Sequence, residues 1–208
     1  MEDVLQVYKL PYDPAYPQVC LDETSKQLIA EVQAPLPCRP GQPYRYESHY
    51  RREGVCQLFL WYEPLTGRRR VAVRDHKGAL DWAAVIAELL EVHYPQAKKV
   101  RLVLDNLNTH AGGSLYQAFA PEKARALYER LEIHYTPKQG SWLNMAEIEL
   151  SVLTGQCLNR RLGSKEELVR EVVAWERQRN EAEARIDWRF STDQARIKLK
   201  KLYPSVVT

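Results

Sequence analysis

Three acidic residues stand at positions of the sequence where carboxylates suggest chemistry. Asp22 interrupts the apolar run of VCLDETS, Asp105 closes the run of KVRLVLDN, and Glu147 follows YTPKQGSWLNMA in a helical segment. Strand interiors disfavour aspartate, and a charged carboxylate in a sheet is costly unless it is paired or bound to a metal. Three carboxylates on rigid elements can hold two divalent cations, an arrangement that suits phosphodiester chemistry.

Each acid also has an ordinary explanation. Asp22 could be a strand-end residue that faces solvent, Asp105 could begin a turn, and Glu147 could lie on the surface of a helix. A polar loop after Asp105 could hydrogen-bond a phosphate, or a carboxylate that itself binds a metal. Its members are Asn106, Asn108, Thr109 and His110.

Apolar patterns predict the elements that would position these acids. Strands are predicted at residues 18–33, 55–62, 68–74, 100–104 and 131–137. The second and third form a hairpin, and a proline-rich irregular loop precedes them. The fourth is a continuous apolar run, as expected for a strand that is buried on both faces. Its carboxyl end, where Asp105 lies, is where open α/β sheets place their ligands.

Helices are predicted between and after these strands. They cover residues 81–94 with Asp81 as the N-cap, residues 113–131 with a break at Pro121, and the chain from Ser141 almost to its end, with a break near 162–164. This order predicts a mixed α/β sheet with helices packed on both faces. We expect an N-terminal arm at 1–17, one domain at 18–162, and a helical extension of that domain at 163–208.

The helix that carries Glu147 has a predicted orientation. Leu143, Ala146 and Leu150 follow helical spacing and define a buried face, with Glu147 at its edge. Glu149 lies two residues further on, about 200° around the helix. We therefore expect Glu147 to face the sheet, and Glu149 to face solvent or a partner.

Composition excludes several classes of protein. The chain has 208 residues, 45% of them hydrophobic, which is enough for the core of one domain. It has no apolar run of about eighteen residues that would span a membrane, and no signal peptide, so we expect a cytoplasmic protein. Its four cysteines form no CxxC pair. The net charge of +3 is too small to establish nucleic-acid binding, although the arginines are clustered.

Three segments resemble the catalytic domain of a DDE transposase of the Tc/mariner superfamily, in its bacterial insertion-sequence branch. They are the LDET strand, the LVLDNLNTH strand and loop, and YTPKQGSWLNMAEIEL, of which the last is the most specific. Two features depart from the family pattern. Met145 stands where many members have a proline, and the gap between Asp105 and Glu147 is longer than in the eukaryotic branch.

The resemblance implies a ribonuclease-H-like fold with a five-stranded mixed sheet. It also implies two Mg²⁺ or Mn²⁺ ions held by Asp22, Asp105 and Glu147, and DNA hydrolysis and strand transfer by a homodimer on DNA. DNA contacts are expected from residues near the acids, namely Asn106, His110, Lys138, Trp142 and Asn144.

Several alternatives stay open on the sequence. The chain could be another ribonuclease-H-like nuclease, or a non-catalytic module for DNA binding or oligomerisation that derives from a transposase. A helix-turn-helix part that reads the element ends could be encoded separately, and the chain could be a second reading frame, a truncation or an excised domain. The sequence does not specify the terminal repeats, the target site or the oligomeric state.

Overall fold

The five strands form one mixed sheet in the order β3-β2-β1-β4-β5. The computed structural model describes residues 1–107, 110–138 and 140–203. The strands are β1 (Gln18–Glu31), β2 (Tyr50–Glu63), β3 (Arg68–Arg74), β4 (Val100–Leu104) and β5 (Leu131–Tyr135). The first three are antiparallel neighbours, and β4 and β5 continue the sheet in parallel with β1. The predicted mixed sheet is therefore confirmed.

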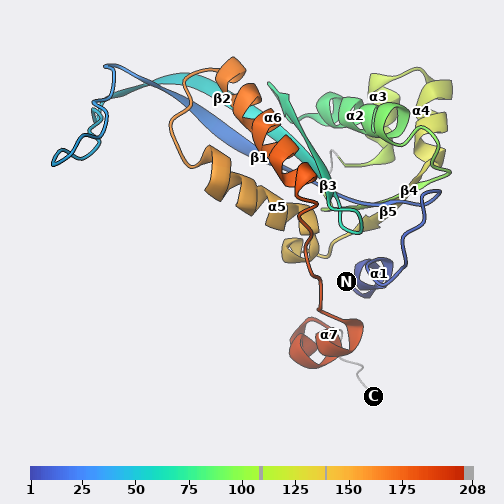
Figure 1. Ribbon diagram of the computed structural model, residues 1–208. Helices are drawn as coiled ribbons and strands as arrows, with labels where there is room; N and C mark the ends of the chain where they lie inside the picture. Colours follow the sequence, from blue (N-terminus) through green and yellow to red (C-terminus); the bar gives the residue numbers. More distant parts are fainter. Residues whose placement is uncertain (108–109, 139, 204–208) are drawn as a thin grey trace.

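Helices cover both faces of this sheet, as Figure 1 shows. One face carries α2 (Ala79–Glu88), α3 (Gly112–Ala118) and α4 (Pro121–Glu129). The other carries α5 (Met145–Leu153) and α6 (Lys165–Glu181). Short π-helical segments extend α2 over Leu89–His93 and α5 over Thr154–Leu158, and 3-10 turns lie at Ser141–Leu143 and Lys200–Leu202.

The strand β1 divides the hydrophobic core into two layers. Successive side chains of a strand point to opposite faces. Cys20 accordingly belongs to the cluster under α5 and α6, whereas Val19 and Leu21 belong to the cluster under α2, α3 and α4. Residues that follow Leu21 along β1 continue this alternation as the strand leaves its pairing with β4, which ends at Cys20 opposite Val103.

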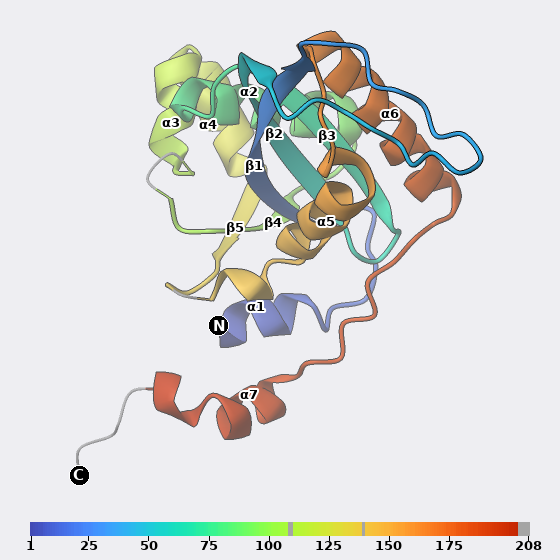
Figure 2. The same ribbon diagram turned by 90° about the vertical axis from the view of Figure 1, so that its left-hand side faces the viewer.

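The N-terminal arm contains a helix that the sequence analysis did not predict. Helix α1 (Glu2–Val7) buries Val4, Leu5 and Val7 against the layer that holds α5. After α6 the chain runs extended to α7 (Thr192–Lys198), which lies beside α1 in both views (Figure 1 and Figure 2). The Arg196 guanidinium donates two hydrogen bonds of 2.8 Å to the Glu2 carboxylate. The two ends of the described chain are thus joined.

Three details differ from the predicted elements. Helix α2 begins after Gly78, and Asp81 is its third residue, where its carboxylate accepts a hydrogen bond from the Gly78 amide at 3.0 Å. Asp81 is therefore not the N-cap. Strand β2 begins at Tyr50, earlier than predicted, because it extends the hairpin with β1. The segment between α6 and α7 is not helical, whereas the predicted breaks at Pro121 and near 162–164 are present.

No helix in the described part of the chain is both long enough and apolar enough to cross a membrane.

Candidate active site

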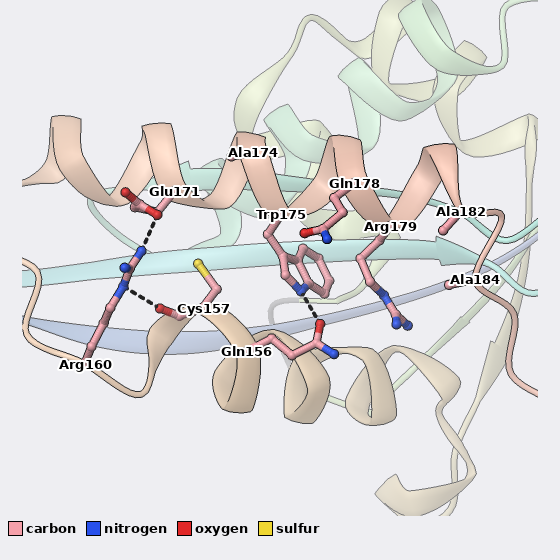
Figure 3. A pocket seen from close by; sticks show the side chains of 10 residues that line it. All are labelled: Gln156, Cys157, Arg160, Glu171, Ala174, Trp175, Gln178, Arg179, Ala182 and Ala184. Carbon is pink, nitrogen blue, oxygen red and sulfur yellow. Dashed lines mark hydrogen bonds and ion pairs between the residues drawn. The ribbon is translucent and has the colours of Figure 1, made fainter.

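Asp22, Asp105 and Glu147 line one open pocket with a volume of about 410 Å³. The rest of its wall is mostly polar and consists of Glu23, Thr24, Ser141, Leu150, Ser151 and Thr154. A larger pocket of about 670 Å³ lies between α6 and the end of α5 (Figure 3). Its only acid, Glu171, is already hydrogen-bonded to Arg160. The smaller pocket is therefore the candidate active site.

Strand register places the two aspartates side by side. Cys20 of β1 lies opposite Val103 of β4, and these strands run parallel. Asp22 and Asp105 each follow two residues later, so both lie where this parallel pair ends. This is the carboxyl edge at which open α/β sheets bind ligands.

Helix α5 presents Glu147 to the same place through its N-terminal anchor. The carbonyl of the Asn144 side chain accepts a hydrogen bond from the Ala146 amide at 3.1 Å and so caps the helix. The amide of the same side chain donates to the Leu21 carbonyl at 2.8 Å, one residue before Asp22. Asn144 is fully buried. It fixes the start of α5 against β1, and Glu147 lies exposed in the first turn.

Negative charge is concentrated around Asp22 in this pocket. Among the described residues, no cationic side chain forms an ion pair with Asp22. Burial raises the pKa of Asp22, and the charges of Glu23, Asp105 and Glu147 add to this effect, so that the pKa reaches about 7. A hydrogen bond from the Glu23 amide, at 2.8 Å from Oδ1, opposes the shift only in part. A carboxylate with a raised pKa among other carboxylates is stabilised by a bound cation.

The donor set suits a hard divalent cation, because all three acids offer carboxylate oxygen. In the part of the chain that the structure describes, no three His, Cys, Asp or Glu side chains converge closely enough to enclose a metal ion. The acids thus share a pocket without forming a closed cage.

One of the expected DNA contacts, His110, lies against this site. His110 is 1% exposed, and its ring stacks on Trp82 with centroids 5.8 Å apart. Its Nδ1 lies 2.5 Å from Oδ1 of Asp105, and its Nε2 lies 3.3 Å from Oε2 of Glu23. Burial lowers the pKa of His110, but the contacts with Asp105 and Glu23 outweigh it and raise the pKa to about 9.

A model of the DDE superfamily endonuclease family matches residues 17–169, a range that includes all three acids. The chain belongs to the DDE superfamily endonuclease family. A comparison with curated protein sequences found no match.

Solved structures agree with this family at the level of the fold. The Mos1 mariner paired-end complex with Mn matches with a TM-score of 0.56 and 16% identity over 84% of this chain and 52% of the Mos1 chain. A pre-cleavage Mos1 transpososome gives a TM-score of 0.55 and 16% identity over 86% and 58%. The paired-end complex with Mg gives 0.55 and 19% over 83% and 51%. The endonuclease domain is therefore ribonuclease-H-like, as predicted, and the chain spans little more than half of these relatives.

The five residues of this DDE-family chain that are expected to contact DNA differ in how exposed they are. Asn106 and Lys138 are exposed beside Asp105, around a pocket of about 180 Å³. Trp142 is 39% exposed, with one edge against Phe190 at a centroid distance of 5.5 Å. His110 and Asn144 are buried, so burial does not support a contact of their side chains with DNA, and that expectation stays a prediction. Asn108 and Thr109 lie outside the described residues.

The predicted orientation of Glu149 is also wrong. Its side chain is fully buried, with Oε2 2.9 Å from Nε of Arg69 and Oε1 accepting a hydrogen bond from Arg179 at 2.8 Å. Glu147 and Glu149 do diverge around α5, as the helical geometry requires. The face opposite Glu147 is covered by β3 and α6, which supply the two arginines. Glu23 was not predicted as a site residue, because nothing in the local sequence distinguished it from a solvated neighbour of Asp22.

Proposed function

We propose that this chain is the catalytic domain of a transposase that hydrolyses DNA and transfers the resulting strand. The observation that carries the proposal is the meeting of Asp22, Asp105 and Glu147 in one pocket, with the pKa of Asp22 raised by burial and by the charges of the other acids. Family membership and the ribonuclease-H-like fold support it. So does the resemblance of the three motifs to Tc/mariner transposases of bacterial insertion sequences.

The three acids would hold two Mg²⁺ or Mn²⁺ ions. Bound ions of this kind lower the pKa of water and stabilise charge on a leaving oxygen. The Mos1 relatives were solved with Mn and with Mg as paired-end complexes, which supports both the metal and the DNA partner. Asp22 would serve as the central ligand because the charges of both Asp105 and Glu147 act on it.

The reaction needs no covalent intermediate with the protein. Water attacks a phosphodiester phosphorus in line with the leaving 3′-oxygen, which departs as a 3′-hydroxyl. That hydroxyl then attacks a phosphorus of the target strand and displaces the 3′-oxygen there, so one phosphodiester forms for each that breaks. Lys138 and Asn106, exposed beside Asp105, would contact phosphates and set the register of the strand.

The resemblance to Tc/mariner transposases implies that two copies act together on DNA and that a helix-turn-helix part, which could be encoded separately, reads the element ends. The described basic residues near the pocket would contact phosphates and not base edges. We infer that sequence recognition belongs to the other part.

Plasmid nicking in Mn²⁺ or Mg²⁺ tests the proposal. Asp22→Asn, Asp105→Asn and Glu147→Gln should each abolish nicking while the protein stays folded. Glu122→Gln is a matched control, because Glu122 is an exposed residue on α4, on the other face of the sheet. Joining of a labelled 3′-hydroxyl oligonucleotide to plasmid would test strand transfer. Normal nicking in any of the three variants, or in excess EDTA, would remove that acid or the metal from the mechanism.

Activity on other substrates separates the rival nucleases. Cleavage of RNA–DNA hybrids or four-way junctions, without oligonucleotide joining, would favour a ribonuclease H or a resolvase of the same fold. Absence of any Mn²⁺ binding would favour a non-catalytic module.

A further inference from the structure

The His110 side chain is held more firmly than packing alone would require. Its ring stacks on Trp82 of α2, and its backbone carbonyl accepts a hydrogen bond from the Tyr135 hydroxyl at 2.8 Å. The His110 amide in turn donates to the Leu107 carbonyl at 3.0 Å. These contacts come from α2, β5 and the loop itself, so both the backbone and the ring of His110 are held in place.

Both ring nitrogens face carboxylates from different strands. Nδ1 lies 2.5 Å from Oδ1 of Asp105 at the end of β4, and Nε2 lies 3.3 Å from Oε2 of Glu23 in β1. The Glu23 side chain is 4% exposed. A buried carboxylate and a buried imidazole are costly unless they partner each other. Two apolar side chains would fill the same space without the free-energy cost of burying charge. Packing alone therefore does not explain why a carboxylate and an imidazole lie here.

Glu23 and Asp22 are adjacent but point to opposite faces of β1. Asp22 lines the pocket together with Glu147 of α5. Glu23 also borders this pocket, but its carboxylate reaches His110, whose ring stacks on Trp82 in the layer of α2. His110 therefore links Glu23, on the same strand as Asp22, to the carboxylate of Asp105. Carboxylates that bind metals are commonly oriented by a partner behind them.

We propose that His110 is a positioning residue that orients Asp105 for metal binding, and that Glu23 holds the His110 ring in place. The proposal rests on the function proposed above. The contact engages Oδ1 of Asp105 and would leave its Oδ2 available to a cation. Replacing such a partner typically lowers metal affinity by about 10–100-fold.

Two substitutions at His110 separate its two nitrogens. The side-chain amide nitrogen of Asn lies near the position of Nδ1, and that of Gln reaches the position of Nε2. His110→Asn therefore keeps the donor toward Asp105, whereas His110→Gln keeps the donor toward Glu23. Both lose the aromatic ring on Trp82, so each serves as the packing control for the other.

Calorimetric titration of the metal-free protein with Mn²⁺ at pH 7.5 provides the readout. We expect His110→Gln to lose about 10–100-fold in Mn²⁺ affinity and His110→Asn to lose much less. Their melting temperatures without metal should be alike. Nicking by His110→Gln should recover as Mn²⁺ is raised, because the chemistry itself is intact. Equal losses of affinity in the two variants would assign His110 to packing and overturn the proposal.

Glu23→Gln gives a second test that leaves the ring on Trp82. It removes the buried charge beside Nε2, so a smaller loss of Mn²⁺ affinity in the same direction is expected. Wild-type affinity in Glu23→Gln would overturn the role assigned to Glu23. Failure of the wild-type chain to bind Mn²⁺ would instead reject the proposed function. Wild-type binding that Asp105→Asn abolishes, with His110→Asn and His110→Gln equal, would reject only the positioning role.

Discussion

Glu149→Gln should strongly lower the free energy of unfolding of this protein. Glu147→Gln, two positions away, should change it very little. Glu149 and Arg69 both have fully buried side chains, 2.9 Å apart between Oε2 and Nε. Arg69 also donates to the Ala184 carbonyl and lies over the Tyr62 ring, 5.2 Å from its centroid. A neutral Gln would leave the Arg69 guanidinium buried without a counter-charge.

The magnitude follows from the burial. Removing one partner of a buried ion pair costs about 3–5 kcal/mol, whereas a change at an exposed residue usually stays within about 0.5 kcal/mol. Total stabilities are about 5–15 kcal/mol, so Glu149→Gln would remove a large share. Arg179, whose side chain is 22% exposed, can turn to solvent and adds less. Glu147→Gln is the matched control, since Glu147 is exposed on the same helix.

Urea denaturation in EDTA, followed by tryptophan fluorescence and circular dichroism, measures both variants. Glu149→Gln should lower the midpoint sharply, and Glu147→Gln should leave it unchanged or slightly higher. Replacing Arg69 and Glu149 together by Met should recover most of the loss, because an apolar pair avoids the buried charges. A free energy of unfolding for Glu149→Gln within about 0.5 kcal/mol of wild type would refute this account of the buried network.

Three further predictions concern charge. Because the pKa of Asp22 is about 7 instead of its ordinary 3.8, the native state keeps a proton between these pH values that the unfolded state has released. Metal-free stability should therefore fall, by at most about 4 kcal/mol, as pH rises through this window. In Asp22→Asn the melting temperature should depend less on pH between pH 4 and 8, and an equal dependence in both proteins would contradict this. Mn²⁺ at pH 8 should raise the melting temperature of the wild type but not of Asp22→Asn, and an equal rise in both would place the metal elsewhere. DNA affinity should be independent of sequence and fall steeply with salt, and Lys138→Gln should reduce the salt slope by about one; an unchanged slope would remove Lys138 from the interface.

The sheet and the two aspartates could be predicted because their signals are local. Val100–Leu104 is a continuous apolar run, so a buried strand and an acid at its carboxyl end follow from the sequence directly. Helix α1 could not be predicted in the same way. Its three buried residues are stabilised by packing against distant parts of the chain, and a six-residue helix has little stability of its own.

The error at Glu149 has a physical cause. Helical geometry correctly placed Glu147 and Glu149 on different sides of α5, but the sequence pattern treated charge as a sign of exposure. The partners that make burial possible, Arg69 and Arg179, come from β3 and α6, far away along the chain. No window around Glu149 contains them, and so no local pattern could have shown that this side of α5 is covered.

The candidate site lies where the two core layers meet at the end of one strand pair. Asp22 and Glu23 are adjacent on β1, yet Asp22 faces Glu147 of α5 and Glu23 faces His110 beside Trp82 of α2. Asp105 lines the pocket on one side and contacts His110 on the other. A pocket built on the α5 layer alone would fix only one face of these acids. Because Asp105 contacts His110 in the α2 layer as well, a change in either layer should reach the proposed metal ligands, and the paired substitutions at His110 measure that influence from the α2 side.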